Sequence, residues 1–274
     1  MNFDLAADQR AIRDAFARFV DERVAPQAAA IDEARAFPRA LFAELGALGL
    51  FGMRYPQDVG GSGLALPEFA LALEEVARGS MSLAGAAAMQ SLMGTKFLHL
   101  LGNADIARRL LGPALRGDRI GAICMTEPGA GSDLQGIRTS AVKEGNHYVV
   151  NGSKIFISNG YLADVIILVT KTDPSAGAKG TTLMLLETKK AEGFKVGRIL
   201  EKLGQKGQDT CELFFDNVRI PAQNVLGAEG MGFMQLMVEL PYERLMLGVG
   251  AMAAIEMAIE ITLEYTKERK AFGK

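Results

Sequence analysis

Apolar residues near the start of the chain recur at the spacing of a helix. One helical face carries Leu5, Ile12, Phe16, Phe19 and Val20. The pattern is interrupted by the turn-forming residues Pro38, Pro56, Gly60, Gly61 and Pro67. A further helix is predicted to begin after Asn103, because asparagine caps helix starts and Asp105 follows in the first turn. Residues 4 to about 115 are therefore predicted to form a helical domain, with a Gly-rich loop at 51–63.

From about residue 120 the apolar residues are β-branched or aromatic and lie in short runs. These runs are bounded by Asn-Gly, Asp-Pro and Gly-rich turn signals, which is typical of short strands. The expected strands cover residues 147–150, 154–157, 165–169, 182–186 and 212–215. This region is predicted to be a compact β domain.

An Ala-, Met- and Leu-rich helical pattern returns from about Glu229 and continues to Lys274 without a stop signal. We interpret the missing stop as a sign that this helical segment is cut. The predicted fold class is α+β. It consists of an N-terminal helical domain at 1–117, a middle β domain at 118–226 and the start of a truncated C-terminal helical bundle at 227–274.

Composition excludes several classes of partner. With 274 residues, 49% of them hydrophobic, the chain is long enough to bury the cores of two or three modest domains. The formal net charge is −2 and the basic residues are scattered, which is unlike a nucleic-acid or anionic-membrane binder. Unbroken apolar runs such as Val165 to Val169 are much shorter than the roughly 20 residues that span a bilayer. We therefore expect no nucleic-acid partner and no membrane span.

The first residues carry Asp4 and Asp8 where a secretory or mitochondrial leader would be basic, so the expected location is the cytoplasm. The chain has two cysteines and two histidines, each well separated along the sequence. Neither a disulfide framework nor a metal site is expected from such spacing. The chemistry must then come from an organic cofactor or from carboxylates, hydroxyl groups and backbone.

The segment Cys124 to Gly136, CMTEPGAGSDLQG, is a candidate anion-binding loop. Its proline and glycines bend the chain so that backbone N–H groups can converge on an anion, while Thr126 and Ser132 add hydroxyl donors. From these residues alone, the motif also fits an ordinary Pro-Gly turn closed by Ser132 or Asp133.

This loop follows a helical domain, opens a β domain and precedes GSKIFISNG at 152–160. That order resembles the acyl-CoA dehydrogenase family, and the resemblance extends over the whole chain. It implies FAD as the cofactor, with the loop from Ile123 to Ser132 lying along the flavin. Thr126 would contact the ring edge, and Ser132 would lie near both pyrophosphate and substrate. The loop residues implied to contact the cofactor are Ile123, Cys124, Met125, Thr126, Gly131 and Ser132.

The resemblance also implies that Phe156, Ile157 and Ser158 pack on the isoalloxazine face, with the Ser158 hydroxyl near N5. Many members of the family have tryptophan where Phe156 stands, and the aromatic ring preserves the stacking. From the residues alone, Phe156 also fits an ordinary core position of a strand.

Glu243 lies within an apolar helical pattern. At about 100° per residue, its predicted stripe consists of Leu236, Leu240, Leu247, Ala254 and Ile261. Glu256 and Glu260 are predicted to lie on the other side of the helix. Burial raises the pKa of a carboxyl group, which suits a base that holds a proton near neutral pH. A purely structural ion pair with a neighbouring basic residue is the alternative.

The resemblance favours the catalytic role. Most branches of the family place their catalytic glutamate later in the C-terminal domain, whereas the long-chain and isovaleryl branches place it in this helix before an arginine. The run ELPYER at 239–244 is similar to the long-chain branch. It implies Glu243 as the base, with Arg244 and Met234 lining the acyl-CoA channel.

The ending ERKAFGK at 268–274 resembles a family stretch in which the residue matching Arg269 reaches the FAD of a neighbouring subunit. A guanidinium group suits this role because it bonds two phosphate oxygens at once. A solvated charge near a helix C-terminus is the alternative.

The implied function is FAD-dependent α,β-dehydrogenation of acyl-CoA thioesters, in which Glu243 removes the α-proton and the β-hydrogen leaves as hydride to flavin N5. Fatty-acid β-oxidation, an electron-transfer flavoprotein as acceptor and a homotetramer are also implied. An acyl-CoA oxidase and a non-catalytic acyl-CoA- or flavoprotein-binding fragment stay open as alternatives. A medium or long linear acyl group is expected, because Gly248 and Gly250 leave room beside the helix.

Overall fold

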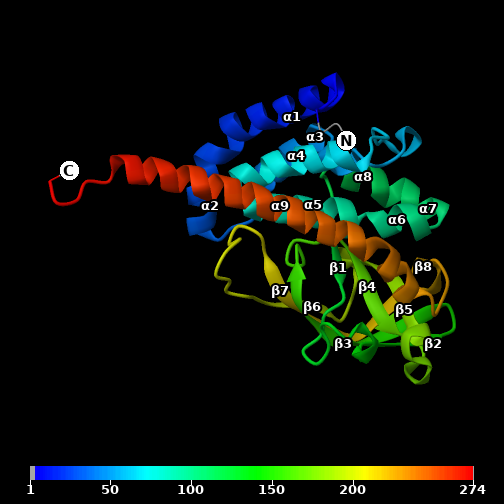
Figure 1. Ribbon diagram of the computed structural model, residues 1–274. Helices are drawn as coiled ribbons and strands as arrows, with labels where there is room; N and C mark the ends of the chain where they lie inside the picture. Colours follow the sequence, from blue (N-terminus) through cyan, green and yellow to red (C-terminus); the bar gives the residue numbers. More distant parts are fainter. Residues whose placement is uncertain (1–3, 274) are drawn as a thin grey trace.

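The computed structural model describes residues 4–273, and Figure 1 shows a layer of helices packed on a β domain, with the long helix α9 running along their boundary. The helices are α1 (Ala7–Phe19), α2 (Ala28–Ala34), α3 (Arg39–Ala47), α4 (Leu66–Gly79), α5 (Met81–Ala88), α6 (Lys96–Leu101), α7 (Ala104–Ile106), α8 (Gly112–Leu115) and α9 (Gly232–Glu268). The strands are β1 (Gly121–Cys124), β2 (Ser140–Glu144), β3 (His147–Ser158), β4 (Val165–Lys171), β5 (Thr181–Glu187), β6 (Phe194–Ile199), β7 (Thr210–Pro221) and β8 (Val225–Leu226). The predicted α+β class is confirmed.

Local sequence signals account for the start of the helical layer. Phe16 and Val20 are buried in its core, as the amphipathic pattern predicts. A Cβ atom on Gly79, the last residue of α4, would lie 2.4 Å from Val20 Cγ1, so glycine permits the close approach of α4. The helix start predicted at Asn103 is confirmed, because its side-chain oxygen accepts the N–H groups of Asp105 and Ile106 at 3.1 and 3.0 Å.

The β domain is an 8-stranded sheet in the order β6-β7-β3-β2-β4-β5-β8, with β1 beside β4. Strand β4 pairs in parallel with β1 and β2 and antiparallel with β5. Its Val165, Ile167 and Val169 belong to the core shared with the helices, whereas Ile166 and Leu168 belong to a second core inside the β domain. Because successive side chains of a strand point to opposite faces, β4 joins the two cores.

One predicted turn is wrong. Asn151-Gly152 was expected to separate two strands, but both segments belong to the single 12-residue strand β3. The register against β7 shifts between Val150 and Gly152, which is a β-bulge and not a hairpin. Glycine is needed there because φ is +152° and an added Cβ atom would lie 2.5 Å from Thr139 Oγ1.

A buried glutamine connects the helical layer to the start of the sheet. Gln90 is 0% exposed and lies in a π-helical turn, Met89–Gly94, that extends α5. Its Nε2 donates to the carbonyl oxygens of Ala114 and Arg119 at 2.8 and 2.9 Å, and its Oε1 accepts the N–H of Gly121 at 2.7 Å. The amide therefore fixes the first residue of β1 against the end of the helical layer.

Helix α9 is a continuous 37-residue helix that contains Pro241. Its buried residues are Gly232, Leu236, Glu239, Leu240, Met246, Gly250 and Ala253. Within the described chain no residue beyond Ala253 is buried, and Figure 1 shows the end of α9 projecting past the other elements. Large apolar side chains on its other faces are exposed, among them Val238, Leu245 and Ile255 at 62, 53 and 51%.

By length and composition alone, α9 is the one described helix that is long and apolar enough to cross a membrane, with a mean hydropathy of 1.6 over an 18-residue window. No unbroken apolar run indicates this property in the sequence, because charged residues interrupt the apolar pattern of α9. A helix that packs inside a bundle passes the same test, since it is also apolar on most sides.

The role of Gln90 gives a testable prediction. Gln90→Met removes the partners of three backbone groups, two of which are buried, and should lower the free energy of unfolding by about 3 kcal/mol or more, measured by urea unfolding. The control is Gln57→Met, the same exchange at an exposed position, which should change this free energy by about 0.5 kcal/mol or less. Equal effects of the two substitutions would contradict the assigned role.

Candidate active site

Phe156 has an unusual conformation for a phenylalanine in a strand. Its φ angle is +61°, in the left-handed region, and its side chain is 62% exposed. It lies where the register of β3 against β7 shifts, between Lys154 and Ile157. The interpretation of Phe156 as an ordinary core residue is therefore wrong. Backbone strain of this kind is held in place only by surrounding structure and is concentrated at functional sites.

The loop that follows β1 lies beside this strained segment. The N–H of Ile155 donates to the carbonyl oxygen of Thr126 at 3.0 Å. A tight turn then forms, in which Glu127 and Ala130 exchange backbone hydrogen bonds of 2.9 and 3.1 Å. The loop is thus closed on itself and fixed next to Phe156.

Several donors in the loop after β1 and at the end of β3 have no acceptor among residues 4–273. They are the half-buried hydroxyl groups of Thr126 and Ser158, the exposed hydroxyl of Ser132, and the backbone N–H groups of Gly131 and Ser132. An exposed aromatic ring and unpaired donors on two adjoining segments fit a cofactor with a planar ring system and an anionic tail. FAD has both parts, so the residues present fit this cofactor.

A buried ion pair holds the loop against β3. Lys154 has a side chain that is 0% exposed, and its Nζ donates to Glu127 Oε1 at 2.9 Å and to the Met125 carbonyl oxygen at 3.0 Å. The Glu127 carboxylate also accepts the N–H groups of Arg138 and Thr139 at 2.6 and 2.9 Å. One carboxylate thereby ties together the loop, β3 and the segment that leads into β2.

The electrostatics of this pair follow from burial. Desolvation lowers the pKa of Lys154, although Glu127 opposes that shift. Burial also acts to raise the pKa of Glu127, but the charge of Lys154 and the hydrogen bonds to the carboxylate outweigh it, so the pKa of Glu127 is lowered. The lowered pKa of Glu127 favours its ionised form, and the negative charge of Glu127 opposes the loss of the proton from Lys154.

Some predicted cofactor contacts can be made only by the backbone. The side chains of Ile123 and Cys124 are buried on opposite faces of β1, and Ile157 is 2% exposed inside the β-domain core. Burial raises the pKa of the Cys124 thiol well above its usual range. The side chain of Ile157 points into the β-domain core, so its expected contact with the flavin face falls to its backbone and stays a prediction.

Glu243 is half-buried on α9. Burial raises the pKa of its carboxyl group, and the neighbouring charge of Arg244 opposes this shift. Within residues 4–273 the carboxyl forms no ion pair and no hydrogen bond, so the alternative of a structural ion pair has no support. A carboxyl group in this state is suited to accept a proton from a bound molecule.

The apolar stripe predicted around Glu243 is only partly correct. Leu236 and Leu240 are buried, whereas Leu247 and Ile261 are 57 and 61% exposed and Ala254 is half-buried. Helical periodicity identifies residues that share a face, but it does not show how far the packing partner extends along the helix.

The packed face of α9 is also rotated from the predicted one. Beyond Glu243 the contact with α4 and α5 continues through Met246, Gly250 and Ala253. Glu256 and Glu260, which were predicted on the other side, line a pocket together with residues of α4.

The remaining predicted site residues are exposed. Met234 and Arg244 lie on α9, with Met234 58% exposed, and Arg269 directly follows the last residue of α9 at its projecting end (Figure 1). The described chain does not bring Arg269 to the loop or to Phe156. Its contact with FAD of a neighbouring subunit therefore stays a prediction.

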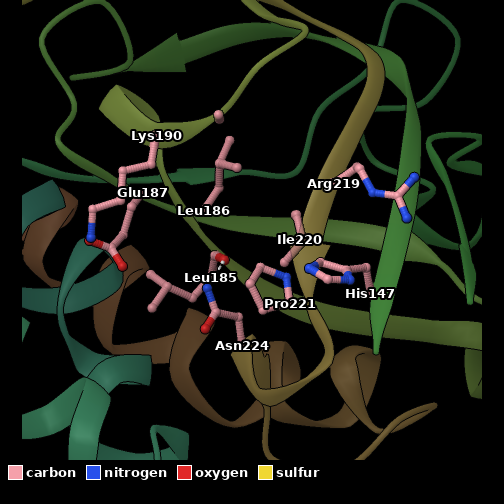
Figure 2. Close-up of a pocket in the computed structure, with 10 residues that line it drawn as sticks. His147, Leu185, Leu186, Glu187, Lys190, Arg219, Ile220, Pro221 and Asn224 are labelled. Atoms are coloured by element: carbon pink, nitrogen blue, oxygen red, sulfur yellow. Dashed lines mark hydrogen bonds and ion pairs between the residues drawn. The ribbon is translucent and has the colours of Figure 1, made fainter. Parts of the chain in front are cut away.

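A separate pocket lies at one end of the β domain. Figure 2 shows His147, Ile220 and Pro221 on one side of it and Glu187 with Lys190 on the other. It is lined by His147, Leu185, Leu186, Glu187, Lys190, Ala191, Arg219, Ile220, Pro221 and Asn224. None of these is a predicted site residue, and the two cations pair with carboxylates, Lys190 with Glu187 and Arg219 with Glu144. This pocket is distinct from the surface around Phe156.

Family models match three successive parts of the chain. They describe the N-terminal domain of acyl-CoA dehydrogenase at residues 6–118, the middle domain at 122–218 and the C-terminal domain at 230–274. The chain is 56% identical to benzylmalonyl-CoA dehydrogenase of Aromatoleum aromaticum over 100% of its own length and 72% of that protein. It is 42% identical to the mitochondrial long-chain specific acyl-CoA dehydrogenase of Sus scrofa, over 96% of its own length and 61% of that protein.

Solved structures agree in fold. Butyryl-CoA dehydrogenase from Megasphaera elsdenii gives a TM-score of 0.94 at 33% identity, covering 100% of this chain and 72% of that one. A glutaryl-CoA dehydrogenase from Mycobacterium smegmatis in complex with FADH2 gives 0.90 at 32% identity, covering 98 and 68%. A structure described with the electron transferring flavoprotein of Acidaminococcus fermentans gives 0.95 at 34% identity, covering 100 and 72%. The chain therefore belongs to the acyl-CoA dehydrogenase family, a family of flavin-dependent enzymes.

Sequence reasoning missed the residues that support the site. Glu127 and Lys154 lie inside the two motifs that indicate the family, but they were not assigned a role. The available signal was a lysine between Gly152 and the apolar run that follows it, since a charge at such a position is either exposed or paired.

The buried ion pair gives a second prediction. Lys154→Met leaves Glu127 as an unpaired buried charge and should lower the free energy of unfolding by about 3–5 kcal/mol, measured by urea unfolding. Adding Glu127→Gln removes that charge and should restore part of the loss. Lys190→Met breaks an exposed pair and serves as the control, with an expected loss of about 1 kcal/mol or less. A loss in Lys154→Met no larger than the control would refute the role of the pair.

Proposed function

We propose that this chain carries the catalytic surface of an FAD-dependent dehydrogenase that introduces an α,β double bond into acyl-CoA thioesters. The observation that carries the proposal is Glu243, a half-buried carboxyl of raised pKa with no ion-pair partner within residues 4–273. Family membership supports it, because the matched proteins are acyl-CoA dehydrogenases. The matched relatives are longer than this chain, so the activity proposed is that of the whole protein.

Each residue has a stated part in the proposed reaction. Glu243 removes the α-proton of the thioester, and its raised pKa lets the carboxyl hold that proton. Phe156 stacks on the planar ring of the cofactor, while Thr126, Ser158 and the N–H groups near Ser132 donate to its polar atoms. Bound FAD supplies the acceptor for the β-hydrogen, which leaves as hydride.

Helix α5 links the two halves of this surface. Gly250 of α9 packs close to α5, since an added Cβ atom would lie 3.9 Å from Met81 Cε. At the other end of α5, the carbonyl oxygen of Ala86 accepts a hydrogen bond of 3.0 Å from Asn159, three residues beyond Phe156. The helix that carries the proposed base and the strand that carries the stacking ring therefore share one support.

The identity of the acyl group is a separate part of the proposal. A linear group was expected because two glycines leave room beside α9. The space beside Gly248 is open, but Gly250 is closed by Ala77 and Met81, whose side-chain atoms would lie 3.8 and 3.9 Å from an added Cβ. We favour a thioester that carries an aromatic ring and a second carboxyl group, because identity to a benzylmalonyl-CoA dehydrogenase is 56% against 42% for a long-chain enzyme.

An electron-transfer flavoprotein is the proposed electron acceptor, supported by the structural neighbour described with such a flavoprotein. An acyl-CoA oxidase would use the same surface but pass the electrons to oxygen, and oxygen uptake during turnover would distinguish it. A non-catalytic binding module would bind acyl-CoA without bleaching the flavin. The homotetramer, the role in fatty-acid β-oxidation and the cytoplasmic location stay predictions.

The assignment of the base is tested with Glu243→Gln in the FAD-loaded protein. The exchange keeps size and polarity but removes the proton acceptor, so anaerobic flavin reduction by substrate should slow by ~10²-fold or more, followed by loss of flavin absorbance. Binding of FAD and acyl-CoA should be unchanged.

Glu239→Gln is the matched control, because Glu239 is a buried carboxyl one turn earlier on the same helix. It should reduce flavin at a rate close to that of the parent. Near-parental reduction by Glu243→Gln would show that Glu243 is a structural acid and that the base lies elsewhere.

The acyl-group proposal is tested by comparing kcat/KM for benzylmalonyl-, butyryl-, octanoyl- and palmitoyl-CoA. Benzylmalonyl-CoA should be preferred by about tenfold or more, which corresponds to about 1.4 kcal/mol of transition-state binding. Preference for octanoyl- or palmitoyl-CoA would instead support the linear group expected from the sequence.

A further inference from the structure

The connection between β6 and β7 bridges the helical layer and the β domain. The N–H of Lys206 donates to Asp32 Oδ1 at 3.2 Å, and the N–H of Gly207 donates to Ser82 Oγ at 3.1 Å. The side chain of Gln208 lies over Gly85, where an added Cβ atom would be 2.7 Å from Gln208 Oε1. This connection is therefore fixed to α2 and α5 before it enters β7.

The same connection holds the turn that follows Phe156. Asn159 is fully buried with a φ angle of +60°, a second left-handed residue in this segment and one whose type tolerates that conformation. Its N–H donates to the Asp209 carbonyl oxygen at 3.2 Å, and its side-chain oxygen accepts from Gln208 Nε2 at 3.3 Å. The N–H of Tyr161 donates to Asp209 Oδ2 at 2.8 Å. Backbone and side chain of Asp209 thus bond both ends of the turn.

Asp209 is in an unusual state for a carboxyl group. It is 7% exposed, and its second oxygen, Oδ1, is buried with no hydrogen-bond partner. The nearby Lys202 does not bond it, because Lys202 Nζ donates to the Gln208 carbonyl oxygen at 2.6 Å and to Thr210 Oγ1 at 3.0 Å. A buried acid that bonds one backbone N–H and leaves one oxygen unpaired is costly for the fold, which points to a role other than stability.

We propose that Asp209 is the positioning residue that holds the strained segment from Phe156 to Asn159, so that the Phe156 ring is presented outward for stacking on the cofactor. The cofactor part of this inference rests on the proposed function. The support of the ring by Asp209 does not, and it can be measured without FAD.

Protonation of Asp209 is expected to stabilise the fold as a whole but to loosen the turn after Phe156. Burial raises the pKa of Asp209 to about 6, opposed by the Tyr161 N–H and by Lys202. The other titratable groups that face it are Cys211 on β7 and, through Lys202, Asp32 of α2.

Because the folded-state pKa lies above the unfolded one, protonated Asp209 contributes stability that is present at low pH and is lost as pH rises through about 6. Protonation also weakens the charge-assisted bond to Tyr161, so the segment that carries Phe156 should become less ordered as pH falls through the same range.

The chain contains no tryptophan, so a single tryptophan introduced at position 156 would be its only indole fluorophore. Phe156→Trp places a single indole at an exposed position where a larger ring needs no repacking. Its fluorescence anisotropy reports the local order of the segment. In the Phe156→Trp protein, anisotropy should fall as pH is lowered from 7.5 to 5.

Adding Asp209→Ala should lower the anisotropy at all pH values, since the acceptor of the Tyr161 N–H is lost. Adding Asp209→Asn should keep the anisotropy near the parental value at pH 7.5 and remove its pH dependence, because the amide oxygen still accepts but does not titrate. Asp216→Asn, the same exchange at an exposed position of β7, is the control and should change neither.

Stacking is measured on the same proteins by quenching of the indole on addition of FAD. Asp209→Ala should raise the dissociation constant by about tenfold, the usual effect of losing one hydrogen bond to a charged group. Unchanged anisotropy in Asp209→Ala, or a pH profile equal in Asp209→Asn and its parent, overturns the positioning role. If the Asp209 variants change the anisotropy as expected but FAD does not quench the indole in any of the proteins, the positioning role is upheld and the proposed function is refuted.

Discussion

The arrangement of the candidate active site depends on the need to neutralise one buried charge. Lys154 lies on β3 with no exposed side-chain atoms, so an ammonium group there needs a hydrogen-bonded acceptor or counter-charge inside the protein. Glu127 is that partner, and the same carboxylate accepts two backbone N–H groups at the start of the segment leading to β2. These bonds hold the loop after β1 in its path along β3. That path leaves Thr126 beside Phe156 with its hydroxyl unpaired and available to a ligand.

Sequence reasoning succeeded where the cause is local. Asn103 caps its helix through its own next residues, and α1 buries the face that its apolar spacing predicts. It failed where the cause is a contact between distant segments. Glu127 and Lys154 are 27 positions apart, and neither motif indicates that their side chains are in contact. The Asn151-Gly152 pair shows the same limit, since the approach of Thr139 and not the dipeptide itself determines the bulge.

The candidate site shows a similar division. Motifs located the loop, the exposed ring of Phe156 and the carboxyl on α9, and the structure gives Phe156 and Glu243 unusual environments at those positions. The sequence did not reveal which atoms are presented. Ile157 is turned inward by strand geometry, and the packed face of α9 is set by α4 and α5. Asp209 carried no signal, because its environment is made by residues from three separate segments of the chain.

The left-handed conformation of Phe156 has a consequence for the stability of the fold. Glycine adopts a φ angle of +61° without strain, so the fold alone would be relieved by losing the ring. Asparagine tolerates the same angle better than phenylalanine does. The aromatic ring therefore costs the fold stability, and only an interaction made by the ring itself would offset that cost.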